Sequence, residues 1–352
     1  MTPNIQLQEA LKGLFFCPLS SRPFSPILRP VEVKKGDVVG IGALNLDLFY
    51  EVEDLSLLGL EAGREVCCGA HGFSEVAAKV NHHGRLVSRS PGGSAANTIY
   101  TLARLGFSTG FIGKVGEDVE GDELLSGMEG VDLSRVKRGG KTGLCLVVLD
   151  SKRDRALVVE PNANDTLRFE DLDLDYICGF RMLHMSAFVG DGPFEAQRRL
   201  VEVLPSEVMV SLDPGELYAK RGLDALRGIL RRCWAVFITE GELLTLTRQE
   251  DLRRGAKEVL KAGAELVVCK RGPRGAMLFD RVGSLQFAAD AEERVVDNTG
   301  AGDVFDAGFL AGVLTGMSLE RCLEVAHRLA AKSLKGFGRE AYPTKEDFLQ
   351  CV

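Results

Sequence analysis

A carboxylate follows a glycine-rich run near the carboxyl end of the chain, in the sequence DNTGAGD at residues 297–303. The apolar residues after it predict a helix from about Ala301 to Leu314. The first amides of a helix have no partner inside it, and the positive end of the helix dipole faces the same space. Glycines leave such amides open to a ligand, so the run is suited to bind an anion such as a phosphoryl group. The amides concerned are those of Gly300, Ala301 and Gly302.

Asp303 lies in the first turn of this predicted helix. A carboxylate beside the open amides could accept the proton of an attacking hydroxyl group while the amides stabilise the charge on the group in transfer. The alternative is that Asp303 only complements the positive helix end. Asp306 follows one turn later, and we expect its side chain to be solvated or to support the site from a second layer.

Two polar residues follow the first apolar run of the chain. Residues 38–42 predict a buried strand, and Asn45 and Asp47 come shortly after it. Ligands of open parallel sheets lie beyond the carboxyl ends of the strands, so these side chains are candidates for binding the hydroxyl groups of a substrate. The alternative is a turn that merely ends the strand.

A second glycine pair precedes another predicted helix. Gly92 and Gly93 would let a ligand approach the backbone closely, and the helix runs on to about Leu105. Asn97 in this helix can both donate and accept hydrogen bonds, which suits a sugar hydroxyl. Standing alone, the segment could also be an ordinary glycine-rich turn.

Together these segments resemble the signatures of the ribokinase-like (PfkB) family of carbohydrate kinases. The two signatures lie far apart, occur in the family's order, and belong to a similarity over about residues 37–350. The resemblance implies a Rossmann-like core with a β-sheet lid and MgATP-dependent phosphorylation of an alcohol. The matching segments are residues 299–303 for the carboxyl-terminal signature, 92–97 with 103–106 for the amino-terminal one, and 112–121 for the strand and turn that follow.

The resemblance also implies roles for single residues. Asp303 matches the family's catalytic base, and Asp47 matches an aspartate that holds substrate hydroxyl groups. Glu242 matches the second acid of an Asn-Glu-x-Glu motif and is expected to bind magnesium through water. Thr239 stands where that motif usually has asparagine, and it remains a candidate for nucleotide binding.

Two later segments resemble nucleotide-binding elements of the family. In the turn at residues 269–275, Lys270 would supply charge near the phosphates, and Gly272 and Gly275 would allow close approach of the backbone. Residues 332–342 are similar to the loop that closes over adenine. In many members this loop binds a monovalent cation, such as potassium, together with the aspartate that matches Asp297. Tyr342 occupies a place where a smaller hydroxyl residue is common.

The wider pattern predicts an α/β fold with a three-layer α/β/α, ribokinase-like core. After about residue 170, short apolar runs alternate with helical stretches, which favours a parallel sheet covered on both faces. A predicted hairpin at residues 144–159 interrupts this alternation. So does the region 53–91, which we interpret as strands and loops and which has only a weak helical pattern near residues 73–81. We therefore expect one kinase domain over residues 36–352, with a small β-sheet lid from about 48–90 and 142–162.

Composition limits the classes of function. The chain has 352 residues, of which 45% are hydrophobic and 26% charged, as in ordinary globular proteins. A net charge of −7 gives no sign of nucleic-acid or membrane-surface binding, and the apolar runs are far shorter than the roughly 20 residues that span a bilayer. Nine cysteines without a C-x-x-C pair favour a reducing, cytoplasmic setting. Residues 1–35, with five basic and two acidic residues, are expected to be a weakly ordered extension.

Other classes of function have weaker support in the sequence. Residues 40–45 have only two of the three glycines of a dinucleotide-binding fingerprint, and Arg135 stands where a P-loop ending at residues 140–142 needs its first glycine. A non-catalytic sugar or nucleotide sensor on the same fold is the better alternative, because fold alone does not establish activity. Thr239, which replaces the usual asparagine of the family motif, is compatible with a non-catalytic sensor. The intact Asp303 favours an enzyme.

The acceptor is left open between a sugar and a nucleoside. Residues 184–188 carry no acid after their predicted strand, whereas ribokinase resembles a version with an acid there, which argues against free ribose. The phosphate donor, ATP or ADP, is also open. The exposed edge of the lid sheet could pair with a second copy of the chain and form a homodimer.

Overall fold

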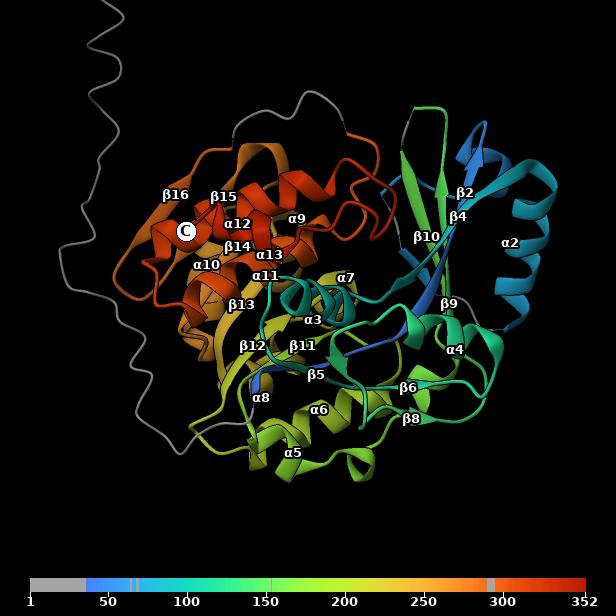
Figure 1. The fold of residues 1–352 in the computed structure, drawn as a ribbon. Coiled ribbons are helices and arrows are strands. Elements are labelled where there is room, and N and C mark those ends of the chain that lie inside the picture. Colours follow the sequence, from blue (N-terminus) through green and yellow to red (C-terminus); the bar gives the residue numbers. More distant parts are fainter. Residues whose placement is uncertain (1–35, 64, 68–69, 153, 290–294) are drawn as a thin grey trace, which may run out of the picture.

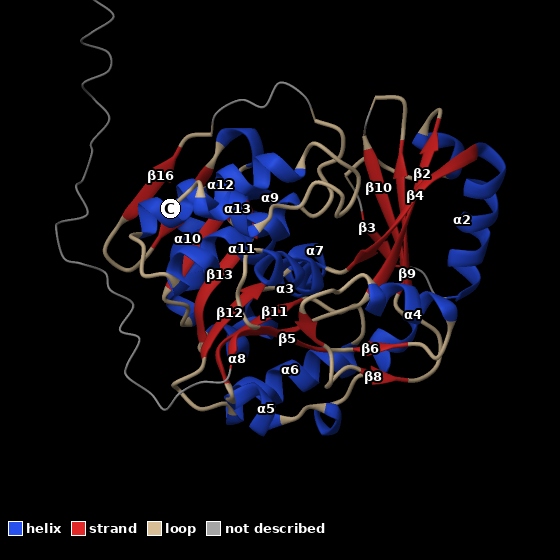
Figure 2. Ribbon diagram, in the orientation of Figure 1, coloured by secondary structure: helices blue, strands red, loops and turns tan. Residues whose placement is uncertain are grey.

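The computed structural model describes residues 36–63, 65–67, 70–152, 154–289 and 295–352. Residues 1–35, the expected extension, lie outside the described residues. The described chain forms a large sheet with helices on both faces and a smaller sheet that projects from one side of this core (Figure 1, Figure 2). The predicted three-layer core with a small β-sheet lid is confirmed.

Nine strands of the described chain form the large sheet, in the order β16-β15-β14-β13-β12-β11-β1-β5-β7. Strands β7 to β14 in this order run parallel, and β15 and β16 at one edge run antiparallel to their neighbours. The sheet is therefore mixed, with the predicted parallel part at its centre. The strands are β1 (Gly36–Ile41), β5 (Thr109–Ile112), β7 (Val131–Asp132), β11 (Phe180–Ser186), β12 (Met209–Asp213), β13 (Cys233–Thr239), β14 (Leu266–Lys270), β15 (Ala276–Phe279) and β16 (Ser284–Phe287).

Both faces of this sheet are buried, which explains why its strands are continuous apolar runs. Successive residues of a strand face opposite sides, so Val38 belongs to the apolar cluster that includes α3, α11 and α12, whereas Val39 belongs to the one that includes α6, α8 and α10. The helices are α3 (Ser94–Arg104), α4 (Val119–Ser126), α5 (Leu174–Cys178), α6 (Asp191–Val203), α7 (Gly215–Arg221), α8 (Leu223–Leu230), α9 (Glu240–Thr247), α10 (Leu252–Ala262), α11 (Ala301–Leu314), α12 (Leu319–Ser333) and α13 (Lys345–Leu349).

Four adjacent parallel strands end on polar or charged residues. Strands β11, β12, β13 and β14 are apolar along most of their length, and their last residues are Ser186, Asp213, Thr239 and Lys270 respectively. Pairing sets Ser186 beside Asp213 and Thr239 beside Lys270. The sheet thus gathers its polar side chains at its carboxyl edge, where ligands of open parallel sheets bind.

Helix α11 enters this edge from a loop and continues through the core. Most of its residues are buried, and it packs closely on α12 because two of its glycines leave room. A Cβ atom on Gly308 would lie 2.7 Å from the Cα atom of Ala326, and one on Gly312 would lie 2.8 Å from the Sγ atom of Cys322. This packing fixes the direction in which the first turn of α11 points.

The lid is a five-stranded sheet in the order β3-β10-β9-β2-β4. Strands β9 and β10 form the predicted antiparallel hairpin, and β2 lies between β9, to which it is parallel, and β4, to which it is antiparallel. A separate two-stranded sheet joins β6 (Lys114–Val115) to β8 (Lys137–Arg138). The lid strands are β2 (Asn45–Val52), β3 (Glu65–Cys67), β4 (Gly84–Gly92), β9 (Gly143–Leu149) and β10 (Arg155–Glu160).

One face of the lid is covered by a helix, in a region that we predicted as strands and loops with only a weak helical pattern near residues 73–81. Helix α2 (Ala70–His83) packs Phe73, Val76, Ala77 and Val80 into the lid's apolar cluster. The opposite face packs on residues of the core side, including Val189 and Phe337. The lid is thus a two-layer unit with an apolar interior of its own.

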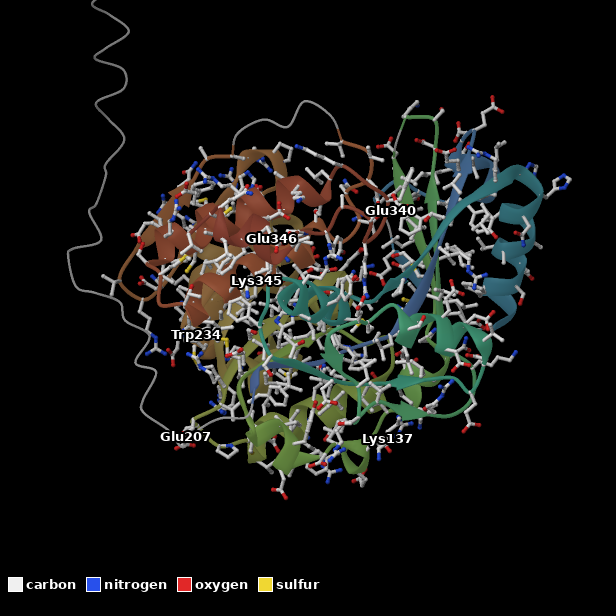
Figure 3. The ribbon with its side chains drawn as sticks, viewed as in Figure 1. Lys137, Glu207, Trp234, Glu340, Lys345 and Glu346 are labelled. Carbon is white, nitrogen blue, oxygen red and sulfur yellow. The ribbon has the colours of Figure 1, made fainter. Side chains whose placement is uncertain are left out.

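The surface of the core carries charged side chains. Lys137, Glu207, Lys345 and Glu346 are exposed, and Figure 3 labels Lys137 and Glu207 at the lower margin of the molecule. Within the described ranges, every helix is too short or too polar to span a membrane.

Candidate active site

The first turn of α11 is the centre of the candidate active site. Gly300 precedes the helix with φ of 75°, a left-handed conformation that favours glycine. A Cβ atom at this position would overlap the hydroxyl group of Tyr342, so no larger side chain fits. The predicted amide cradle at residues 300–302 therefore has the backbone geometry of a helix start.

The carboxylate of Asp303 is held by two donors from α3. Ser94 Oγ donates to Asp303 Oδ1 at 2.8 Å, and Asn97 Nδ2 donates to Asp303 Oδ2 at 2.8 Å. Burial, followed by the charge of Asp213, raises the pKa of Asp303 to about 6, and the two hydrogen bonds act in the opposite direction. The two sequence motifs that carried the family resemblance thus meet at one carboxylate.

Asn97 is fixed from its other end by an arginine. Arg339 Nε donates to Asn97 Oδ1 at 2.9 Å, which defines the orientation of the amide that faces Asp303. The guanidinium group also donates to the Gly127 carbonyl oxygen at 3.2 Å and lies 4.6 Å from the ring centroid of Tyr100. Both ends of the Asn97 amide are engaged within the protein, so contact of Asn97 with a substrate hydroxyl stays a prediction.

A buried ion-pair network lies beside the helix start. Lys270 Nζ contacts Asp213 Oδ2 at 2.8 Å and Asp306 Oδ1 at 3.1 Å. Burial acts against the charge of Lys270, but Asp213 and Asp306 raise its pKa above the ordinary value. A Cβ atom on Gly302 would lie 3.3 Å from Lys270 Nζ, so the ammonium group lies next to the amide cradle. Its predicted contact with nucleotide phosphates is untested.

Asp306 is buried, so the first of our two expectations for it, a solvated side chain, is wrong. Its side chain has no exposed surface, because α11 is buried on nearly all sides rather than on one stripe. Burial raises the pKa of Asp306 well above the ordinary value, and Lys270 acts against this rise. The residue therefore supports Lys270 from inside the core.

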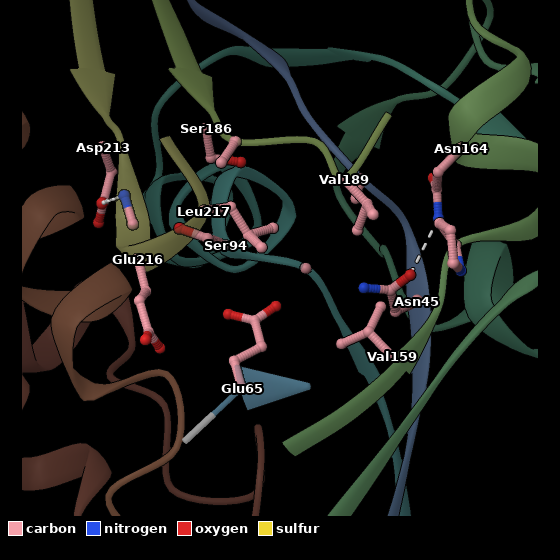
Figure 4. Close-up of a pocket in the computed structure, with 15 residues that line it drawn as sticks. Asn45, Glu65, Ser94, Val159, Asn164, Ser186, Val189, Asp213, Glu216 and Leu217 are labelled. Carbon is pink, nitrogen blue, oxygen red and sulfur yellow. Dashed lines mark hydrogen bonds between the residues drawn. The ribbon is translucent and has the colours of Figure 1, made fainter. Parts of the chain in front are cut away.

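A cavity of about 130 Å³ lies between the lid and the carboxyl edge of the large sheet (Figure 4). The lid contributes Glu65 and Val159, and the core contributes Ser94, Ser186 and Asp213 among others. Asp303 is not itself a lining residue, but Ser94 lines the cavity and donates to Asp303, so one side chain separates the carboxylate from the cavity.

Asn45 is one of the predicted acceptor-binding residues that line this cavity, together with Gly93. Its Oδ1 atom accepts a hydrogen bond of 2.9 Å from Asn164 Nδ2, and the amide nitrogen of Asn45 points toward the cavity (Figure 4). Asn164 is itself fixed by hydrogen bonds with both the amide and the carbonyl of Leu44. The Asn45 side chain is therefore held in place before any ligand binds.

Asp47 lies on lid strand β2, opposite Ser90 of β4. Its carboxyl group packs against Gly92, where a Cβ atom would overlap it. Burial raises the pKa of Asp47 to about 8, and Arg339 acts against this rise. Among the described residues, the cavity wall includes neither Asp47 nor Asn97. The binding role of Asp47 stays a prediction.

The residues predicted to bind magnesium and nucleotide lie at or just after the carboxyl ends of β13 and β14. Thr239 and Glu242 cap the start of α9 reciprocally, with Glu242 Oε2 accepting from the Thr239 amide at 2.8 Å. Burial and Asp213 raise the pKa of Glu242, and Lys270 acts against them. Gly272 and Gly275, with φ of 54° and 81°, make the turn between β14 and β15, and a Cβ atom on Gly275 would overlap the carbonyl oxygen of Phe287.

The donor set near Glu242 suits a metal that keeps much of its water. Among the described residues, no cluster of three or more His, Cys, Asp or Glu side chains could hold an ion by itself. Magnesium in kinase sites is commonly bound by one or two carboxylates, water and the substrate's phosphates. Glu242 with Asp213 nearby fits this arrangement.

Asp297 closes the loop that precedes α11. Its Oδ1 atom accepts hydrogen bonds from the amide and hydroxyl of Thr299, at 2.9 and 2.7 Å, and its Oδ2 atom accepts from the Gly338 amide at 3.0 Å. Arg155 of the lid donates to Thr299 Oγ1 at 3.0 Å, which joins the lid to this loop. Binding of a monovalent cation at Asp297 stays a prediction.

The fold and this site agree with comparisons to known proteins. Residues 67–345 match the pattern that defines the pfkB family of carbohydrate kinases, and the chain belongs to this family. The predicted membership is confirmed.

Relatives within the family carry different names. A sugar kinase of Archaeoglobus fulgidus, described as uncharacterized, is 36% identical over 254 residues, which cover 70% of this chain and 99% of the relative. A cytidine kinase of Thermococcus kodakarensis is 33% identical over 255 residues, which cover 70% of this chain and 89% of the relative. The solved structure of adenosine kinase from Sinorhizobium meliloti has the same fold, with a TM-score of 0.82, 23% identity and coverage of 90% of this chain and 99% of the other.

Several site residues were not predicted from the sequence. Asp213 had a usable signal, since it directly follows the apolar run 208–212 and so stands at the carboxyl end of a predicted strand. Ser94 lies inside the predicted amino-terminal signature, but no role in the site was predicted for it. Glu65 and Arg339 had no local signal, because each reaches the site only through the tertiary fold.

Proposed function

We propose that the protein transfers the γ-phosphoryl group of ATP to a hydroxyl group of a sugar or nucleoside. The observation that carries this proposal is the Asp303 carboxylate, which is held by Ser94 and Asn97 in the first turn of α11 and next to a cavity. Family membership supports a kinase, and the site supplies both a base and an anion site for that chemistry.

The proposed acceptor lies in the cavity between lid and core. Asn45 and Gly93 line this space, and Asp47, Gly92 and Asn97 adjoin its walls and complete the predicted acceptor-binding set. The hydroxyl group of the acceptor donates a hydrogen bond to Asp303, because a carboxylate with a pKa of about 6 is mostly ionised at neutral pH.

In the transfer step, the acceptor oxygen forms a bond to the γ-phosphorus atom while the bond from that atom to the β,γ-bridging oxygen breaks. The electron pair of the broken bond leaves with ADP, and the acceptor's proton passes to Asp303. The amides of Ala301, Gly302 and Asp303 stabilise the negative charge on the group in transfer. The lid is joined to the loop before α11 by the hydrogen bond from Arg155 to Thr299. Closure of the lid would exclude water from the site and so limit hydrolysis of ATP.

The second ligand site would hold the nucleotide. The turn containing Lys270, Gly272 and Gly275 and the capping pair Thr239 and Glu242 lie at the carboxyl ends of β13 and β14. Magnesium, when bound with the nucleotide, would be held by Glu242 together with water and phosphate oxygens, and it would offset the charge of the phosphates.

Product formation with defined donors and acceptors tests this proposal. The full chain would be assayed with magnesium and either ATP or ADP against uncharged sugars, phosphorylated sugars and nucleosides, with chromatographic detection of the phosphorylated acceptor. We expect phosphorylation of at least one acceptor, with ATP as donor. Binding of sugar and nucleotide without product under any condition would contradict the proposal and favour the sensor.

A further inference from the structure

The cavity between lid and core has an acidic wall. Three of its lining residues are carboxylates, namely Glu65 from β3, Asp213 from β12 and Glu216 from α7. Within the part of the chain that the structure describes, no lysine, arginine or histidine lines this cavity. Glu65 reaches the cavity from the lid and Glu216 reaches it from the core, and Figure 4 draws both around the same space.

Several cations of the described residues lie near this wall, and each has a partner in the protein. Arg221, for example, donates to the carbonyl oxygen of Val189, a lining residue. Lys270 contacts Asp213 and also Asp306, and thereby offsets the charge of Asp213. Lys220 pairs with Glu216 at 2.7 Å and offsets part of its charge. Arg155 donates to Thr299 of the loop before α11. None of these cations is itself a lining residue, so the ionisable side chains of the described cavity wall are all carboxylates.

Glu65 lies in surroundings that disfavour its negative charge. Burial, followed by the charge of Glu216, raises its pKa to about 7, and Lys220 acts against this rise. Such an environment makes an additional negative charge costly, because a buried anion needs a counter-ion or donors to replace its hydration. Hydroxyl and amino groups provide those donors, and a carboxylate can accept several hydrogen bonds at once.

We infer that the acceptor carries no phosphate or carboxylate group, and that it turns hydroxyl or amino groups toward Glu65, which acts as a specificity-determining residue of the lid. This inference rests on the proposed function, since it names the class of acceptor for the same cavity. The inferred acceptor is an uncharged or cationic compound with several hydroxyl groups. A neutral sugar, an amino sugar and a nucleoside all meet this description, and separate arms of the test distinguish them.

The test compares acceptors that differ in charge. Ribose and ribose 1-phosphate form one pair, and fructose and fructose 6-phosphate form another, with glucosamine and cytidine as further uncharged or cationic compounds. Binding to the full chain would be measured by titration calorimetry, and product formation with MgATP would be measured separately. We expect the uncharged member of at least one pair, or glucosamine or cytidine, to bind at least tenfold more tightly than either phosphorylated sugar.

Variants of Glu65 connect this preference to the side chain. Glu65→Lys should reduce the preference for uncharged over phosphorylated acceptors by at least tenfold. Glu65→Gln, which keeps the shape and an acceptor oxygen, should selectively weaken binding of a cationic acceptor. Glu207→Lys is the matched control, because Glu207 is exposed and lies close to the amino end of β12, at the opposite end of that strand from the cavity (Figure 3). Far-ultraviolet circular dichroism of each variant would verify that it is folded.

The outcomes separate the two proposals. Tighter binding of a phosphorylated sugar, an unchanged preference in Glu65→Lys, or binding of no compound in the panel would overturn the inference. Phosphorylation of phosphorylated sugars alone would also overturn it and would leave the kinase proposal intact. Binding in the expected order without any product would contradict the kinase proposal, while the charge preference of the cavity would stand.

Discussion

The two sides of the site are built in different ways. On the phosphoryl side, a charged network of Asp303, Lys270, Asp213 and Asp306 lies largely buried at the junction of α11 with the large sheet. On the acceptor side, the lid contributes Glu65 and Val159 from strands of a separate sheet. The phosphoryl side is therefore fixed by the packing of the core, whereas the acceptor side depends on how the lid meets the core. We conclude that substitutions should affect turnover or stability on the first side and acceptor selection on the second.

The largest expected effect is on turnover. Asp303→Asn removes the proposed base and should lower kcat by about 10²- to 10⁴-fold. Nucleotide affinity, measured by titration calorimetry, should stay close to that of the unaltered protein, because the amides of the α11 start are unchanged. Turnover near the original value would show that Asp303 is not the base.

The next effect concerns stability. Lys270→Met leaves Asp213 and Asp306 buried without their cation and should lower the free energy of unfolding by about 3–5 kcal/mol. Urea unfolding can be followed through Trp234 of β13, the single tryptophan of the chain (Figure 3). Lys261→Met is the control, since its pair with Glu258 is at the surface and should contribute less than about 1 kcal/mol. Equal losses in the two variants would contradict the structural role of the network.

A smaller effect should arise from the positioning of Asn97. Arg339→Met removes the donor that orients the Asn97 amide, and we expect kcat to fall about tenfold while the KM for ATP changes little. Arg104→Met serves as the control, because Arg104 binds carbonyl oxygens of Tyr342 and Pro343 in the same region but does not contact Asn97. If both variants lose stability but keep kcat, Arg339 has only a structural role.

The smallest expected effect is on the KM for the acceptor. Asp47→Ala should raise the KM for the acceptor about fivefold, as expected for the loss of one hydrogen bond from a carboxyl group that is mostly neutral at pH 7, and should spare the KM for ATP. Steady-state kinetics with each substrate varied in turn provides both values. An unchanged acceptor KM with impaired ATP binding would move Asp47 to the nucleotide side.

The sequence predicted the phosphoryl side better than the acceptor side for a physical reason. A helix start with its glycines and carboxylate is a local feature, and α11 extends over the predicted residues 301–314. The cavity wall combines segments near residues 45, 65, 164, 186 and 216, whose proximity depends on how the lid packs. No short-range pattern encodes that proximity, so Glu65 and Asn164 were missed.

Two expectations agree with the structure only in part. Helix α2 has apolar residues at the spacing of one helix face, Phe73, Val76, Ala77 and Val80, but the nearby glycines favoured loops. Asp306 was expected either to be solvated or to support the site, and its burial against Lys270 fits the second alternative. Helix α11 has almost no exposed face, and a buried lysine supplies the partner that the sequence alone could not place.

The pH dependence of kcat/KM tests the central claim most directly. If Asp303 must be ionised to accept the proton, kcat/KM should fall as the pH is lowered through about 6, and the decrease reports the free enzyme. The Ser94 hydroxyl stabilises the ionised form, so Ser94→Ala should move this decrease to higher pH. A profile that stays flat through this range, or one that Ser94→Ala leaves in place, would contradict the account.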